Sequence, residues 1–433
     1  MTQLFSVAIA ITAGLMMTRL VKLTKLHFPD VTAYLVAGVL IGPYFLGRLG
    51  VSGLGFASFT SVEELNILSS TALGFIAFAI GNEFRLTQLR STGKQAAAIG
   101  IIQALTATVL VDASLIGLHL LFPDAISIPV AITLGAIAAA TAPAATLMVV
   151  RQYKAKGPLT DLLLPIVALD DAVGLAVFAI SFGVARALRD GELDAISVFV
   201  NPLLEIVLSL VLGSVFGVIL TVLEKYFYSN SNRLSLTIAF VMLTVAVSMQ
   251  EFRIGPVLIS FSSLLVCMML GTVFCNLCPL SSDLMERADR WTAPLFCLFF
   301  VLSGAELELG VFKNPAVIGI GAVYILARSL GKYLGAFGSA KMMKCAPNVQ
   351  KYLGVTLLPQ AGVALGMCMT ASTLGEYEGG LIRNIVLFGV LIYELVGPMM
   401  TKIALTKAGD IQPKSEEVLH RRENKFHSLK ESA

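Results

Sequence analysis

The stretch Leu169-Asp170-Asp171-Ala172-Val173-Gly174-Leu175 places two adjacent carboxylates inside an apolar run that extends from about residue 162 past residue 182. On a helix, which rises about 1.5 Å per residue, Asp171 lies roughly 20 Å from the charged residue Lys156. This depth is near the middle of a hydrocarbon slab about 30 Å thick, where an ionisable residue indicates a functional site. Neighbouring helical side chains point about 100° apart, so one aspartate can face a permeating ion while the other holds a structural cation.

The composition restricts the class of protein. The 433 residues are 56% hydrophobic and 14% charged, with a mean hydropathy of +0.83. A soluble domain of this size could not bury so much apolar surface, so we predict an all-α polytopic membrane protein with the lipid bilayer as its surroundings. The net charge of only +3 gives no case for nucleic-acid binding. The six cysteines lie in or beside apolar runs, and we interpret them as reduced packing residues.

Thirteen apolar segments are long enough to be candidate membrane spans. They cover residues 4–21, 32–49, 65–84, 96–121, 128–150, 160–186, 199–222, 234–250, 255–275, 292–308, 314–338, 352–373 and 381–401. The connecting segments alternate in basic content, with sixteen Lys and Arg residues in one set and six in the other. The positive-inside rule places the richer set and the C-terminus in the cytoplasm and the N-terminus outside, which fits the inner (plasma) membrane of a cell.

Thirteen spans divide into two six-helix units joined by one helix, an arrangement that makes the units inverted repeats. The fifth and twelfth spans should then correspond. They contain Thr141-Ala142-Pro143-Ala144-Ala145-Thr146 and Leu357-Leu358-Pro359-Gln360-Ala361-Gly362, each with a proline near its middle. Although prolines often only kink membrane helices, the matched positions of Pro143 and Pro359 favour two discontinuous helices that cross at the midplane. Their unwound carbonyls and half-helix dipoles would then be available to a cation.

The counter-charge is expected on the eleventh span. Arg328 and Lys332 lie four residues apart and share one helix face. Arg328 lies deeper and needs a partner, and Asp170 is the natural one, which leaves Asp171 free. Lys332 lies closer to the cytoplasmic end, and we expect its ammonium to snorkel to the interface rather than to join the site.

In these features the chain resembles the monovalent cation/proton antiporters, specifically the prokaryotic sodium/proton exchangers with an Asp-Asp motif. The resemblance covers nearly the whole membrane region. It rests on Phe28-Pro29, residues 38–43, 74–83, 299–304, 328–335 and 358–364, the proline-broken fifth span and Asp170-Asp171. It implies a dimerisation domain, a mobile core domain, a homodimer and an elevator-like movement.

The resemblance also assigns roles. Asp171 is the position that binds the cation or the proton, Asp170 pairs with a basic residue, and Thr141 contributes a hydroxyl or carbonyl from the unwound stretch. Many members have lysine where this chain has Arg328, and arginine does not release its proton. This departure leaves the stoichiometry open, and placing Lys332 at the family position is the alternative. The resemblance implies exchange of H⁺ for Na⁺, with Li⁺ or K⁺ as alternatives, without a cofactor and without enzymatic chemistry.

Two further features complete the predictions. Glu394 on the last span is the approximate counterpart of the aspartate pair, either as a second carboxylate of the ion pathway or as a helix-packing partner. The exchanger domain is expected over residues 1–405, followed by a short cytoplasmic tail over residues 406–433. That tail contains no Gly-x-Gly-x-x-Gly motif of a nucleotide-binding domain.

Other classes of protein fit less well. An intramembrane aspartyl protease needs carboxylates on facing helices, whereas Asp170 and Asp171 are adjacent on one helix. A channel does not need a carboxylate pair beside a fixed basic residue. The alternative that remains is a sodium-coupled symporter of an organic solute on the same fold, which solute uptake without a proton requirement would reveal.

Overall fold

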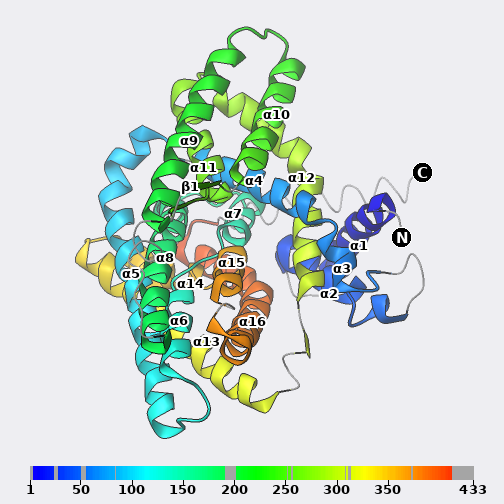
Figure 1. Ribbon diagram of the computed structural model, residues 1–433. Helices are drawn as coiled ribbons and strands as arrows, with labels where there is room; N and C mark the ends of the chain where they lie inside the picture. Colours follow the sequence, from blue (N-terminus) through cyan, green and yellow to red (C-terminus); the bar gives the residue numbers. More distant parts are fainter. Residues whose placement is uncertain are drawn as a thin grey trace.

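The protein is described by a computed structural model for residues 3–23, 28–49, 55–82, 84–190, 201–250, 252–254, 257–307, 309–310, 314–371 and 374–411. These residues form helices and one small β-hairpin (Figure 1). The helices are α1 (Gln3–Leu23), α2 (Asp30–Ile41), the 3-10 helix η1 (Leu46–Leu49), α3 (Phe59–Glu63), α4 (Asn66–Asn82), α5 (Leu86–Leu121), α6 (Ile128–Ile137), α7 (Pro143–Gln152), α8 (Pro158–Asp190), α9 (Asn201–Glu224), α10 (Asn230–Ser248), α11 (Ser263–Leu277), α12 (Ser281–Glu306), α13 (Pro315–Met342), α14 (Pro347–Thr356), α15 (Gly362–Ala371) and α16 (Glu376–Ala408). Most of the predicted tail, residues 412–433, lies outside the described residues.

Within the described residues, eight helical segments are long and apolar enough to cross a membrane. They are α1, α2 together with η1, α5, α8, α9, α10, α13 and α16. Three shorter apolar helices, α4, α6 and α11, overlap other predicted spans, and α11 extends two residues beyond its span. The prediction of a polytopic helical membrane protein is therefore confirmed.

The predicted ninth span, 255–275, is wrong at its start. Strand β1 (Phe252–Ile254) pairs antiparallel with β2 (Val257–Ile259), and α11 begins only at Ser263. The physical reason is local: Gly255-Pro256 is a turn-forming dipeptide, and the residues after it, Val257-Leu258-Ile259, suit a strand as well as an apolar helix. Hydropathy alone does not separate these two structures over so short a run.

Other helices extend beyond their apolar runs or stop within them. Helix α12 begins at Ser281, eleven residues before the predicted start at 292. Ion pairs four residues apart, Arg287–Asp283 and Arg290–Glu286, stabilise this charged first part, which precedes the apolar run. Helix α2 ends at Ile41 because Gly42 and Pro43 interrupt the predicted span 32–49.

The helices pack as two groups. Helices α1, α2, α4 and α9–α12 contact one another, and α5–α8 together with α13–α16 form the second group (Figure 1). Inside the second group, α13 packs along α5, and α8 packs against α5 and α6. The groups meet mainly where α16 contacts α2, where α7 contacts α4 and α2, and where α8 contacts α9.

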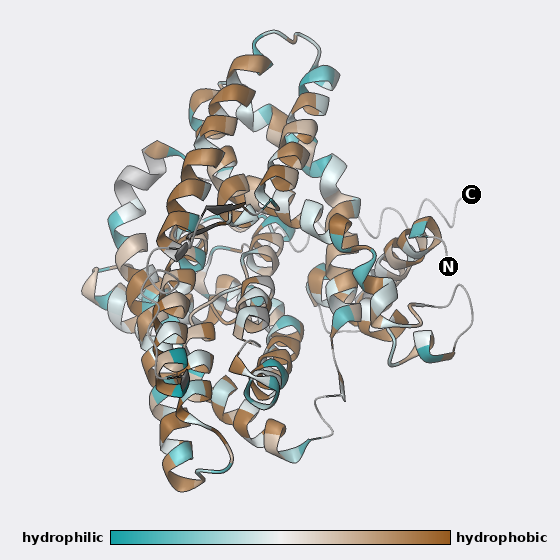
Figure 2. Ribbon diagram, viewed as in Figure 1, coloured by the Kyte–Doolittle hydropathy of each residue, from teal (hydrophilic) through white to brown (hydrophobic). Residues whose placement is uncertain are grey.

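Small residues let the helices approach closely, and large apolar side chains cover the outside. A Cβ atom on Gly38 of α2 would overlap the carbonyl of Val301 on α12, and one on Gly304 would overlap the carbonyl of Leu35. Such small-residue contacts replace hydrophobic burial as the source of helix association in lipid. The long helices consist largely of hydrophobic residues (Figure 2), and many large apolar side chains are exposed, such as Val211 on α9.

Candidate functional site

Two interrupted helices lie at the centre of the second group. Residues 138–142 separate α6 from α7, and residues 357–361 separate α14 from α15. The two breaks touch, because the Ala142 backbone N–H donates to the Pro359 carbonyl at 2.8 Å. The predicted interruptions at Pro143 and Pro359 are thus confirmed, with Pro143 as the first residue of α7.

The carbonyls at the end of α6 and in the break after it lie inside the protein, where side-chain donors satisfy them. Gln360 Nε2 donates to Ile137 O at 3.0 Å. The side chains of α13 satisfy the next three carbonyls: Arg328 donates to Ala138 O at 3.0 Å and to Ala140 O at 2.6 Å, and Lys332 donates to Ala139 O at 2.5 Å. Two cationic side chains at a helix C-terminus also oppose its partial negative charge.

These contacts change the expected use of the unwound carbonyls. Arg328 also donates to Leu358 O at 2.7 Å, so its guanidinium joins both breaks. Its carbon Cζ lies 4.5 Å from the ring centroid of Tyr393, which adds a cation–π contact. Carbonyls that were expected to face a transported cation are therefore held by the protein's own basic residues.

Lys332, not Arg328, pairs with Asp170. Lys332 Nζ lies 2.9 Å from Asp170 Oδ2, and both side chains are completely buried. The expected Arg328–Asp170 pair is wrong, and so is the expectation that Lys332 snorkels to the interface. The reason is the position along α13: Lys332 lies one turn beyond Arg328 and reaches Asp170 and the α6–α7 break, whereas the Arg328 guanidinium is held by carbonyls of both breaks.

Asp170 has further donors. Lys332 Nζ also donates to Thr141 Oγ1 at 2.9 Å, and the Thr141 hydroxyl in turn donates to Asp170 Oδ2. Gln103 of α5 donates its side-chain N–H to Asp170 Oδ1. The structure therefore brings Thr141, Asp170 and Lys332 together, and the charge of Asp170 is balanced inside the protein.

Asp171 differs sharply from its neighbour. Its side chain is 1% exposed, yet neither carboxylate oxygen receives a hydrogen bond from any residue that the structure describes. A buried carboxylate without donors is costly unless it takes up a proton or a cation. Asp171 thus has the two properties that a shared proton and cation site needs, burial and unused oxygen ligands.

Three residues of this region were missed by sequence reasoning. Gln103 binds Asp170, Tyr324 shares hydrogen bonds with Gln360, and Tyr393 donates its hydroxyl to the Ile325 carbonyl. Gln103 had a usable signal, since an amide in the middle of an apolar span needs a polar partner. The tyrosines had none, because aromatic residues also occur as ordinary packing residues in membrane helices.

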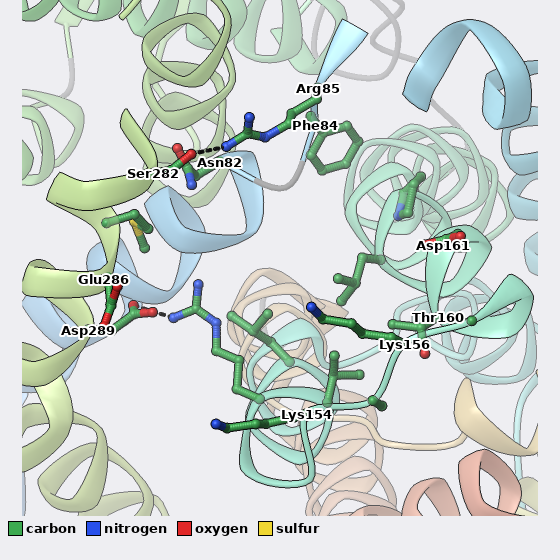
Figure 3. Close-up of a pocket in the computed structure, with 18 of the residues that line it drawn as sticks. Asn82, Phe84, Arg85, Lys154, Lys156, Thr160, Asp161, Ser282, Glu286 and Asp289 are labelled. Atoms are coloured by element: carbon green, nitrogen blue, oxygen red, sulfur yellow. Dashed lines mark hydrogen bonds and ion pairs between the residues drawn. The ribbon is translucent and has the colours of Figure 1, made fainter. Parts of the chain in front are cut away.

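A cavity of about 700 Å³, here called the vestibule, opens where α8 begins (Figure 3). Its lining includes the end of α7, the α7–α8 loop, the first turns of α8 and the charged start of α12. Leu164 and Pro165 line it, only about 8 Å along α8 from the aspartate pair at 1.5 Å per residue. The wall of the vestibule therefore ends within about two helical turns of Asp171.

Opposite charges face each other across the vestibule. Arg151 at the end of α7 forms an ion pair with Asp289 of α12, and Figure 3 shows Lys154 and Lys156 beside it. Arg85 Nη2 donates to Ser282 Oγ at 2.5 Å on the same side. Burial raises the pKa of Asp289 above the ordinary value for aspartate, and the Arg151 guanidinium offsets part of that rise.

Glu394 is the remaining carboxylate that the sequence singled out. Its side chain is buried on α16, and its Oε2 receives no hydrogen bond from the described residues. Its role in an ion pathway stays a prediction.

Beside the two breaks lie a buried ion pair and a buried carboxylate that has no hydrogen-bond donor among the described residues, and comparison with known proteins gives the family. The family model described as "Sodium/hydrogen exchanger, transmembrane" matches residues 7–407. The chain belongs to this family.

Several relatives match over most of their length. The Na⁺/H⁺ antiporter NhaS4 of Synechocystis sp. is 25% identical over 401 residues, which cover 89% of this chain and 94% of the relative. The high-affinity Na⁺/H⁺ antiporter NhaS3 of the same organism is 25% identical, with 86% and 84% covered. The K⁺/H⁺ antiporter subunit KhtU of Bacillus subtilis is 22% identical, with 87% and 88% covered.

The fold is also that of a solved antiporter. The sodium proton antiporter MjNhaP1 of Methanocaldococcus jannaschii matches with a TM-score of 0.68 at 18% identity, covering 94% of this chain and 98% of that structure. An electron-microscopy structure of the same protein gives a TM-score of 0.71 at 16% identity, with 96% and 97% covered. The chain is thus a multi-pass membrane protein of a transporter family, and family membership supports cation/proton exchange.

Proposed function

We propose that this protein exchanges a monovalent cation for H⁺ across the membrane by alternating access, with Asp171 as the group that binds either ion. The observation that carries this proposal is the contrast between the two aspartates. Asp170 is neutralised by Lys332, whereas Asp171 is buried with both oxygens unpaired by the described residues. A carboxylate in this state binds a proton or a cation, but not both at once.

Mutual exclusion at Asp171 is enough to couple the two ions. If the core crosses only when the carboxylate is neutralised, a cation moving in one direction must be replaced by a proton moving in the other. The downhill flow of one ion then drives the uphill movement of the other. Arg328, Lys332 and Gln360 hold the two breaks together around the site, and Thr141 fixes the position of Asp170.

Na⁺ is the first candidate, because NhaS4 and NhaS3 carry Na⁺/H⁺ antiporter in their names. K⁺ is the second, since KhtU is named as a K⁺/H⁺ antiporter subunit, and Li⁺ completes the series. Lys332 is the basic residue that pairs with the first aspartate. In this proposal the chain therefore has a lysine at the family position, and Arg328 does not replace it. No cofactor enters the reaction.

We propose thirteen spans in two inverted six-helix repeats, in which α6–α7 and α14–α15 are the corresponding broken helices. A homodimer, an N-terminus outside and a cytoplasmic C-terminus in the inner (plasma) membrane complete it, with the exchanger domain over residues 1–405 and the tail over 406–433. Glu394 is a second candidate carboxylate of the pathway.

The test is ion-driven proton movement in proteoliposomes that contain a pH-sensitive dye. Na⁺, Li⁺ or K⁺ is added outside, with the membrane potential free or clamped. We expect proton movement with at least one cation, none with Asp171→Asn, and normal movement with the exposed control Asp124→Asn. Proton exchange that persists in Asp171→Asn would refute the assignment of the site, and sodium-stimulated solute uptake without proton movement would favour the symporter.

A further inference from the structure

The C-terminal end of α16 caps the helix that carries the aspartate pair. After α16, Gly409 turns the chain with a φ of 89° and brings Asp410 to the start of α8. Asp410 Oδ2 accepts hydrogen bonds from the Thr160 backbone N–H and the Thr160 hydroxyl, both at 2.7 Å. The first N–H groups of a helix lack partners within the helix, so this carboxylate acts as a cap from 250 residues away.

Asp410 also packs closely against the loop that precedes α8. The Lys156 backbone N–H donates to the Asp410 carbonyl at 2.9 Å. Gly157 has a φ of 158°, and a Cβ atom at this position would overlap Asp410 Oδ1. Asp410 is 4% exposed and the next residue, Ile411, is 2% exposed. The end of α16 is therefore an integral part of the protein at this point, not a loose terminus.

Hydrogen bonds from outside α8 matter at its start because the helix contains Pro165. Proline has no N–H, so the helical hydrogen bond from residue 165 to the Asp161 carbonyl is missing. The first two turns of α8 are consequently less well held by the helix itself. Thr160, Asp161, Leu164 and Pro165 from these turns line the vestibule.

We propose that Asp410 is a positioning residue for ion exchange. It holds the first two turns of α8 in place and so keeps the wall of the vestibule on the helix that carries Asp171. The effect on transport rests on the proposed function, whereas the effect on α8 does not.

The opposite end of α8 offers a matched comparison. Near the end of α8, Arg189 Nε lies 3.6 Å from Oε2 of Glu378 on α16. The Ser127 hydroxyl donates to Glu378 Oε1 at 2.5 Å. Gly375 again has a positive φ, 120°, where a Cβ atom would come within 2.9 Å of the Arg189 guanidinium. Helix α16 thus holds α8 at both ends with a carboxylate, but only Asp410 lies at the vestibule end.

The first experiment measures amide hydrogen exchange of the purified protein by mass spectrometry. In Asp410→Ala, amides of residues 160–164 should exchange about fivefold faster, the factor expected for the loss of a helix cap. Asp410→Asn keeps an acceptor oxygen and should restore most of the protection. Glu378→Ala should leave these amides unchanged. Unchanged exchange of residues 160–164 in Asp410→Ala would overturn the proposal whether or not the protein transports ions.

The second experiment measures transport in membrane vesicles of both orientations. For cation added on the vestibule side, Asp410→Ala should raise the half-saturating concentration about fivefold and change the maximal rate less than twofold, by the same cap energy. Thr160→Val should shift the half-saturating concentration in the same direction by less. A lower maximal rate with an unchanged half-saturating concentration would show that Asp410 only stabilises the helix, and would overturn its positioning role in ion exchange. Absence of exchange in the unaltered protein would count against the proposed function instead.

Discussion

Lys332 and Asp170 form an ion pair of 2.9 Å although neither side chain has any exposed surface. Removing two charges from water costs several kcal/mol each, roughly, and the attraction between them offsets this cost only with further hydrogen bonds. Those bonds are present: Lys332 donates to Ala139 O and Thr141 Oγ1, and Asp170 accepts from Gln103. The pair is therefore balanced, and its partners depend on each other.

This dependence predicts a strongly non-additive pair of substitutions. Lys332→Met or Asp170→Asn alone should lower the free energy of unfolding by about 3–5 kcal/mol, because each leaves the other charge buried and unpaired. The double variant should recover most of that loss. Denaturant unfolding of the detergent-solubilised protein measures all three, and additive losses would contradict the prediction. Lys341→Met, at an exposed position of the same helix, is the control.

Arg328 predicts a different response, because its guanidinium reaches three carbonyls from both helix breaks. Lysine keeps the charge but cannot reach all three, so Arg328→Lys should lower the free energy of unfolding by about 3 kcal/mol. Tyr393→Phe keeps the ring beside the guanidinium and should cost only about 1 kcal/mol for its hydroxyl contacts. Thermal unfolding distinguishes them, and equal losses would show that the carbonyl contacts of Arg328 contribute no more than the hydroxyl contacts of Tyr393.

Competition at one carboxylate predicts the pH dependence of the proposed exchange. Over the pH range in which Asp171 takes up its proton, the half-saturating cation concentration should rise about tenfold for each unit by which the pH falls. The maximal rate at saturating cation should change much less. Initial rates in proteoliposomes at matched internal and external pH measure both quantities. A half-saturating concentration that is independent of pH would mean separate sites for the two ions.

The sequence was sufficient for the broken helices and for placing Asp170 and Asp171 inside the protein, because proline chemistry and charge in an apolar run are local signals. It was not sufficient to decide between Arg328 and Lys332. Those residues differ by one helical turn, about 5.4 Å, and helix ends read from a sequence are uncertain by a similar distance. The choice is made by the positions of α6 and α8 relative to α13, which no local pattern records.

The sequence could not predict the long-range polar contacts either, because they also depend on the relative positions of distant helices. Gln103 and Asp410 are recognisable as polar residues, but their partners Asp170 and Thr160 are 67 and 250 residues away. The strand Val257–Ile259 shows the opposite limit, since an apolar run of this length fits two structures until its neighbours are known.

The ion pair between Arg151 and Asp289 predicts an effect of pH at the vestibule. Their side chains are 19% and 36% exposed, so we assign the pair the 0.2–1 kcal/mol, roughly, of a surface ion pair. It joins α7 of the second helix group to α12 of the first. Under the proposed mechanism the second group moves as the core against the first, so this ion pair must separate. Arg151→Gln should therefore speed exchange at neutral and alkaline pH by at most about fivefold.

The sign of the pH effect follows from Asp289. The pair exists only while this carboxylate is ionised, and burial raises its pKa above the ordinary value. As the pH falls through that pKa, the unaltered protein loses the pair as well, so the ratio of the two rates should approach one. Initial exchange rates across the pH range test this, with Asp289→Asn expected to follow Arg151→Gln. A ratio that stays constant into acid, or a slower variant, would remove the ion pair from the mechanism.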